Sequence, residues 1–255
     1  MCTVVCRWRP EEQYPIELLA LRDELSDRDF DPPGAWWPDH PSLIGGRDRS
    51  AGGTWCASDV TTGVTAVVLN NPEKRVADPG APSRGLLPLL AASHLERWVE
   101  HVDVTGMAGF NLVLATPTSL QWWRFDGTQL SHHELAPGTY LFKPRGRYDG
   151  TDPAIHFDPR LANGAAELSE PDATTETVWA QWLPALHDAA PSADPTALIV
   201  RIPVDGRTYE TVFGQFIAAT AGWLRLDHLD RPAEGTRRPW HVAVHHAAEP
   251  IATSG

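Results

Sequence analysis

The sequence predicts an α+β protein with layered antiparallel β-sheets, and three observations support this fold class. Short runs of β-branched residues recur along the 255-residue chain and are bounded by Pro, Gly and Asn. Two stretches, 86–102 and 174–190, instead repeat apolar residues at helical spacing. Short turns join many neighbouring strands, which favours antiparallel pairing. We expect a single domain over 1–255, with a frayed tail at 247–255.

The first two strands form a predicted hairpin. Residues 2–9 (CTVVCRWR) are rich in β-branched residues and end at Pro10. The apolar run 16–24 (IELLALRDE) follows after the turn-like string PEEQYP. A hairpin with a six-residue loop therefore returns the end of the second strand to the start of the first.

Residues 30–85 contain one further predicted hairpin between two loops. The segment 30–53 is rich in Pro and Gly, and we expect it to be a loop. The strands 54–59 and 64–71 are joined by the turn TTG. The polar loop 72–85 then leads to the first helix.

The remaining elements alternate strands with the second helix. We expect strands at 109–116 and 119–127, a β pattern over 132–142 that passes through a turn at APG, and three or four closing strands within 197–203, 211–229 and 240–246. The Pro-, Gly- and Asp-rich segment 143–170 predicts little regular structure. Thr174 or Thr175 can cap the helix 174–190.

The charge balance excludes several classes of partner. A formal net charge of -12 argues against sequence-independent nucleic-acid binding and against docking on anionic lipid. No secretory signal is present, and no window reaches the roughly 18 apolar residues of a membrane span. The preference for Arg over Lys, with abundant Ala, Pro and Trp, is typical of a high-GC bacterial genome.

The cysteines and histidines predict neither a disulfide framework nor a metal site. Cys2, Cys6 and Cys56 form no zinc motif, and an odd number of cysteines favours a reducing cytoplasm. The His pairs 132–133 and 245–246 each direct adjacent rings to opposite faces of a strand. That geometry is poor for metal binding, so we expect none.

Cys2 has the sequence context of a terminal nucleophile. The predicted hairpin brings Arg22 and Asp23 close to it. A guanidinium lowers the pKa of a thiol, and a carboxylate can orient the α-amine that removal of Met1 would expose. That amine titrates near pH ~8 and can serve as the base of the nucleophile. Asn70 could donate its amide to an oxyanion at the same point.

Each of these features also has a structural interpretation. Cys2 could be a small buried apolar residue on a terminal strand. The acidic and basic residues at 22–24 could form an ion-pair cluster. Asn70 and Asn71 precede Pro72, and turn chemistry explains such a pair equally well.

Several strings resemble one protein family. ALRDE at 20–24 is similar to the ANRDE signature of the NRDE family, also called the transport-and-Golgi-organisation protein 2 family. Further similar strings follow in family order over most of the chain: the MC start, GGTW (52–55), TTGVTAVVLNN (61–71), SRG (83–85), GFNLVLA (109–115), PGTY (137–140) and YETVFG (209–214).

The resemblance implies the N-terminal nucleophile hydrolase (Ntn-hydrolase) fold, a four-layer αββα sandwich with antiparallel sheets. In similar cysteine enzymes, such as bile-salt hydrolases and penicillin acylases, the cysteine after the initiator attacks an amide carbonyl. The implied catalytic residues are Cys2, Arg22, Asp23 and Asn70, with Asn71 as a near alternative for the oxyanion.

The chain departs from the family pattern at two points. Leu21 stands where the signature has Asn. After PGTY the chain reads LFKPRG instead of running through a Ser-Asn pair, so that Lys143 takes the place of that Asn. The residues predicted to bind substrate are Asn71, Trp36, Trp37, Asn111 and Lys143, the two tryptophans as an apolar pocket lip in a Pro-rich loop.

These features predict that Cys2, after removal of Met1, cleaves or transfers an acyl group from an amide or thioester. The alternative is a non-catalytic binding or trafficking protein for haem or acyl-coenzyme A, ligands with which the family is associated. No cofactor is required, and haem would enter only as a ligand. The expected partner is a small acyl or amide substrate or a hydrophobic ligand, not nucleic acid.

Overall fold

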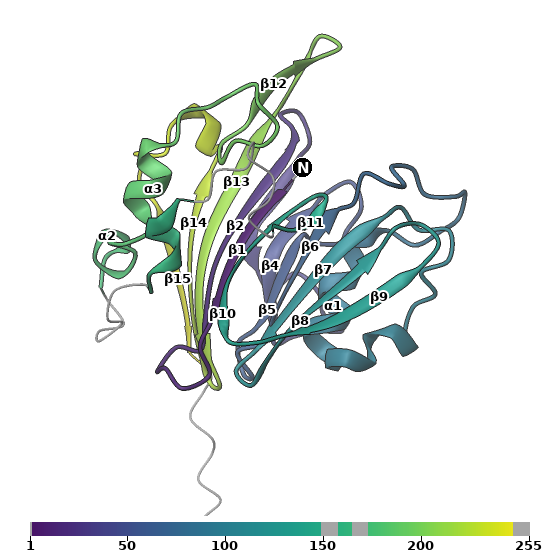
Figure 1. Cartoon of the computed structure of the whole chain (residues 1–255), viewed down its shortest axis with the longest axis horizontal. Helices are drawn as coiled ribbons and strands as arrows, with labels where there is room; N and C mark the ends of the chain where they lie inside the picture. The colour runs from purple at the N-terminus through teal and green to yellow at the C-terminus, as the bar shows by residue number, and fades with distance from the viewer. Residues whose placement is uncertain (1, 149–157, 165–172, 247–255) are drawn as a thin grey trace, which may run out of the picture.

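The computed structural model describes residues 2–148, 158–164 and 173–246, whose strands form two sheets (Figure 1). The first sheet has the order β11-β10-β1-β2-β13-β14-β15, and β12 pairs with β13. Its strands are β1 (Cys2–Trp8), β2 (Ile16–Leu25), β10 (Gly138–Lys143), β11 (Gly146–Arg147), β12 (Arg201–Val204), β13 (Arg207–Thr220), β14 (Trp223–Asp230) and β15 (His241–His246).

The second sheet follows the chain from β3 to β9 without a crossover. Its strands are β3 (Phe30–Gly34), β4 (Leu43–Asp48), β5 (Cys56–Asp59), β6 (Thr65–Asn70), β7 (Phe110–Thr116), β8 (Ser119–Phe125) and β9 (Leu130–Leu135). Every pairing between the strands of either sheet is antiparallel, which confirms the predicted sheet type.

The helices of the described residues are short. They are α1 (Leu87–His94), α2 (Thr175–Val178) and α3 (Leu183–Asp188), with 3₁₀ segments η1 (Arg84–Leu86), η2 (Leu95–Glu100), η3 (Pro159–Ala162) and η4 (Pro232–Glu234). In the part of the chain that the structure describes, none is long and apolar enough to cross a membrane.

Three apolar clusters hold the elements together. The first lies between the two sheets and joins residues such as Val4 of β1 to Val113 of β7. The second packs α1 and η2 on the outer face of the second sheet, with Trp98 fully buried there. The third packs α2 and α3 on the outer face of the first sheet, which Figure 1 shows on the side away from the second sheet.

The hairpin β1–β2 lies inside the first sheet because both of its faces are apolar. Val4 belongs to the cluster between the sheets, whereas Val5 belongs to the cluster under α2 and α3. This alternation is the period of two expected of a strand. The hairpin prediction is confirmed, and the register pairs Cys2 with Arg22.

The structure corrects both predicted helices. The range 86–102 is not one helix, because Leu95 takes φ 53° and ψ -136° and ends α1. The chain continues as the 3₁₀ segment η2. The range 174–190 divides into α2 and α3, and Thr174 caps α2 by accepting a hydrogen bond from the N–H of Thr177.

Two predicted loops also contain strands. The segment 30–53 is not loop throughout, because β3 and β4 pair within it despite their Pro and Gly residues. The range 132–142 forms two strands in different sheets, with Ala136 and Pro137 between them. The segment 143–170 contains β11 and η3, while 149–157, 165–172 and the tail 247–255 lie outside the described residues.

Candidate active site

Cys2 begins β1, and its Cα lies directly opposite that of Arg22 on β2. Directly paired residues on antiparallel strands direct their side chains to the same face. That face points between the sheets, where Cys2 is half-buried against the apolar cluster. The hairpin alone therefore brings a guanidinium beside the thiol.

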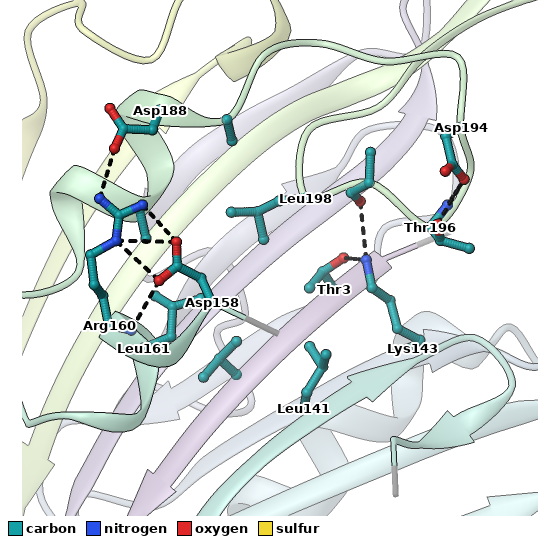
Figure 2. A pocket seen from close by; sticks show the side chains of 14 residues that line it. Thr3, Leu141, Lys143, Asp158, Arg160, Leu161, Asp188, Asp194, Thr196 and Leu198 are labelled. Atoms are coloured by element: carbon teal, nitrogen blue, oxygen red, sulfur yellow. Dashed lines mark hydrogen bonds and ion pairs between the residues drawn. The ribbon is translucent and has the colours of Figure 1, made fainter. Parts of the chain in front are cut away.

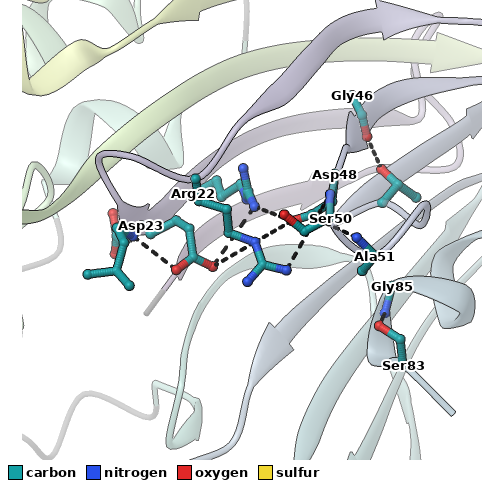
Figure 3. A network of polar contacts seen from close by, with 12 residues as sticks. Arg22, Asp23, Gly46, Asp48, Ser50, Ala51, Ser83 and Gly85 are labelled. Carbon is teal, nitrogen blue, oxygen red and sulfur yellow. Dashed lines mark hydrogen bonds and ion pairs between the residues drawn. The ribbon is translucent and has the colours of Figure 1, made fainter.

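Arg22 is fixed by contacts with the second sheet. Its Nη2 donates to Asp48 Oδ2 at 2.7 Å, and its guanidinium lies 4.4 Å from the ring centroid of Trp55. Asp48 also accepts from Arg28 Nε at 2.7 Å, so that one carboxylate holds two guanidinium groups (Figure 3). Burial raises the pKa of Asp48, but the hydrogen bond from Arg28 and the two positive charges outweigh it and leave that pKa low.

Asp23 faces the opposite side of β2, where the residue is 4% exposed. Its Oδ1 accepts from Thr211 Oγ1 at 2.7 Å. Burial raises the pKa of Asp23 to about 6, although the α-ammonium of the chain, the Thr211 hydroxyl and the Lys143 ammonium oppose the shift. A β-bulge between Thr211 and Phe213 puts Thr211 opposite Asp23, and bulges commonly redirect a side chain beside a functional site.

Burial also raises the pKa of the Cys2 thiol. The charge of Asp23 also raises this pKa, whereas the α-ammonium of the chain, a hydrogen bond from the Asp23 backbone and the guanidinium of Arg22 lower it. The neighbouring groups therefore do not supply a preformed thiolate. A nucleophile here needs a base that takes the thiol proton during attack.

Asn70 ends β6 and reaches the same space from the second sheet. A pocket of about 120 Å³ is lined by Cys2, Arg22, Asp23 and Asn70 together with Arg84. The four residues predicted as catalytic thus line one pocket. Asn70 is exposed at this edge of the sheet.

Asn71 has structural partners instead. Its side-chain Nδ2 donates to the carbonyl of Phe125 at 3.1 Å, and its Oδ1 accepts from the N–H of Glu73 at 3.2 Å. These bonds hold the turn after β6. Asn71 lines the neighbouring cleft rather than the cysteine pocket.

Lys143 is buried on the same face of the first sheet as Asp23. Its Nζ donates to Thr3 Oγ1 at 2.7 Å, as Figure 2 shows. It also donates to the carbonyl of Ala197 at 3.1 Å. Burial lowers the pKa of Lys143, and the charges of Asp23 and Cys2 counteract part of that shift.

The other predicted substrate-binding residues do not line the cysteine pocket. Trp36 donates to the carbonyl of Pro32 and lies under the guanidinium of Arg47. Trp37 donates to the carbonyl of Gly52. Both tryptophans therefore stabilise the β3–β4 region.

Asn111 also lies away from the pocket. It is fully buried, donates to the carbonyl of Pro144 at 2.9 Å and accepts from Trp122 Nε1 at 3.1 Å. Its amide thereby anchors the turn after Lys143 to the second sheet.

Sequence reasoning missed Asp48, Arg84 and Thr211 as members of the site. Asp48 stood in a segment predicted as loop, so that no strand register connected it to Arg22. Arg84 belongs to the SRG string, and its Nη1 donates to the carbonyl of Gly109 at 2.9 Å. The resemblance of SRG and YETVFG to family strings marked the last two regions. The SRG string also opens a predicted helix, where either an ordinary cap or an anion site fits the sequence.

The described residues contain no group of three His, Cys, Asp or Glu side chains arranged to hold a metal ion. His132 stacks on Trp123 and His133 on Trp122. The two rings thus lie on opposite faces of β9, as the sequence predicts.

Comparison with known proteins gives one family. The model of the family described as Transport and Golgi organisation 2 matches residues 1–144, which is more than half of the chain. The matched range includes Cys2, Arg22, Asp23, Asn70 and Lys143. A search of curated proteins found no match.

Proposed function

The chain belongs to the Transport and Golgi organisation 2 family, and we propose that it is an Ntn-hydrolase-like protein whose nucleophile is Cys2. After removal of Met1, Cys2 would attack the carbonyl of an amide or thioester. Arg22 stabilises negative charge at the sulfur, Asp23 orients the α-amine, and Asn70 donates to the oxyanion. The two facing sheets with helices on their outer sides would then be the four-layer αββα sandwich.

The observation that carries this proposal is the register of the first hairpin. It sets Cys2 opposite Arg22 and next to Asp23, and these three residues share a pocket with Asn70 of the other sheet. Two sheets therefore supply groups to one point at the start of β1. A buried carboxylate with a raised pKa in such a pocket is typical of functional sites.

The raised pKa of Cys2 determines how the reaction would proceed. The α-amine takes the thiol proton as the sulfur–carbon bond forms. The tetrahedral oxyanion is held by the Asn70 amide. The bond to the leaving amine or thiol then breaks, and the proton passes from the α-ammonium to that group. Water or a second nucleophile finally releases the acyl group from Cys2.

Intact-mass measurement with an acylating thioester probe tests this proposal. We expect the mature protein to lack Met1 and to gain one acyl group, whereas Cys2→Ala gains none. Cys6→Ala is the matched control, because Cys6 is buried and burial raises its pKa to about 12. Full retention of Met1, or equal labelling of wild type and Cys2→Ala, would refute the proposal.

The alternative is a carrier for haem or acyl-coenzyme A that holds its ligand without cleaving it. The observation that favours it is a cleft of about 900 Å³ beside the cysteine pocket, large enough for a sizeable ligand. A haem titration distinguishes the two functions. A Soret shift that persists in Cys2→Ala, with no acyl labelling of wild type, would favour the carrier.

A further inference from the structure

The large cleft shares a wall with the cysteine pocket. Arg84 and Asn70 line both spaces, so that the cleft lies directly beside the pocket that contains Cys2.

The cleft is positively charged, although the chain as a whole is strongly acidic. Arg75, Arg84, Lys143 and Arg145 line it, and none of its lining residues is Asp or Glu. The whole sequence carries a net charge of -12. The lining of this cleft, with four cations and no carboxylate, therefore differs in charge from the chain as a whole.

These four cations also lack the ion pairs that most cations of the chain have. Among the described residues, six Lys and Arg side chains form no ion pair with a carboxylate: Arg9, Arg75, Arg84, Lys143, Arg145 and Arg147. Four of these six line the one cleft. Unneutralised cations in a concave site attract anions and hold them through charge-assisted hydrogen bonds.

The cations are graded in depth. Arg75 and Arg145 are exposed, Arg84 is half-buried, and Lys143 is buried. Pro, Ile, Val and Tyr side chains supply apolar surface between them. Such a wall fits a ligand with an anionic group at one end and carbon chain beside it.

We infer that the acyl donor attacked by Cys2 carries an anionic group, a carboxylate or a phosphate, which binds in this cleft between Arg75, Arg84 and Arg145. The inference rests on the proposed function, because the bound donor would present its carbonyl to Cys2 past Asn70. The Cys2 sulfur forms the new thioester bond, the bond to the leaving mercaptide breaks, and the thiol proton goes to that mercaptide.

Three butanoyl thioesters test the inference: S-butanoyl-3-mercaptopropionate, S-butanoyl-2-mercaptoethyl phosphate and the neutral S-butanoyl-2-mercaptoethanol. Calorimetric titration into Cys2→Ala measures binding without turnover. Intact mass of wild type measures butanoylation of Cys2. We expect at least one anionic donor to bind about tenfold or more tighter than the neutral one. The two anionic donors show whether carboxylate or phosphate is preferred.

Arg75→Ala with Arg145→Ala, made in the Cys2→Ala protein, should remove most of this preference. Both side chains are exposed, so that the melting temperature should stay unchanged. Arg9→Ala is the matched control, because Arg9 also lacks an ion pair but lies at the opposite end of β1. It should leave the preference intact.

Binding and acylation give separable outcomes. Equal binding of charged and neutral donors to Cys2→Ala overturns the inference, even if Cys2 is acylated. If Arg9→Ala loses the preference for anionic donors to the same extent, the inference is overturned as well, because the effect would then reflect overall charge. Anion-selective binding that depends on Arg75 and Arg145, without acylation of wild type, supports the anion site and contradicts the proposed function.

Discussion

Replacing Asp23 by Asn should stabilise the protein at neutral pH. Burial raises the pKa of Asp23 from 3.8 to about 6, so that the folded protein holds a proton which the unfolded chain releases at lower pH. Stability therefore falls as pH rises through the window from about 4 to about 6. The loss above that window is about 3 kcal/mol, at 1.36 kcal/mol for each pKa unit. The Asn side-chain oxygen can still accept the Thr211 hydroxyl.

Urea unfolding at two pH values measures the effect. We expect the advantage of Asp23→Asn over wild type to shrink by about 1.4 kcal/mol between pH 8 and pH 5, because Asp23 is then mostly protonated in the folded state. The matched substitution Asp59→Asn should instead destabilise the protein at neutral pH. Although burial raises the pKa of Asp59, hydrogen bonds from Ser42 and Thr61 outweigh it and lower that pKa. An advantage of Asp23→Asn that is constant with pH would refute the reasoning.

Three further substitutions test the packing around the site and the corrected helix by urea unfolding. Arg22→Ala should cost about 3 kcal/mol, because it removes a buried guanidinium from its carboxylate on β4; a loss below about 1 kcal/mol would contradict this. Gly63→Ala should lower the free energy of unfolding by at least about 2 kcal/mol more than Gly52→Ala does. Both glycines have φ 73°, but only at Gly63 would a Cβ meet a backbone oxygen, that of Thr220 at 2.3 Å; equal losses would show that this contact relaxes. Leu95→Gly should stabilise the protein by about 1 kcal/mol, because φ 53° with ψ -136° suits only glycine, and a lower urea midpoint would contradict the strain.

The sequence could predict the pairing of Cys2 with Arg22 because local patterns determine it. A β-branched run, a Pro-bounded turn and a second apolar run specify a hairpin, and a hairpin specifies which residues face one another. Asn70 was predictable for a similar reason, since it ends a strand of a second hairpin. Its approach to Cys2 depends on how the two sheets pack, which the family resemblance suggested and strand patterns alone did not.

Contacts that depend on tertiary packing could not be predicted from the sequence. Trp36 and Trp37 were predicted at a pocket lip because aromatic residues in a loop favour binding, but their indole N–H groups bond backbone carbonyls of the β3–β4 region. The break at Leu95 carries no sequence signal, because leucine is a good helix former. Asp48 lies two residues after a Gly-Gly pair, which predicts a loop, and only the sheet reveals that it holds Arg22.

The Cys2 thiol and the Asp23 carboxyl both have raised pKa values, and nearby cations offset these shifts only in part. Burial disfavours negative charge on both Cys2 and Asp23, and the charge of Asp23 disfavours it further on Cys2. The guanidinium of Arg22 is engaged by Asp48, and the Lys143 ammonium donates to neutral oxygens of Thr3 and Ala197. The α-ammonium at the start of the chain is the largest charge that lowers the pKa of both Cys2 and Asp23. Removal of Met1 would therefore keep the cation that opposes the burial of both acids and would move it to residue 2, where it could also accept the thiol proton.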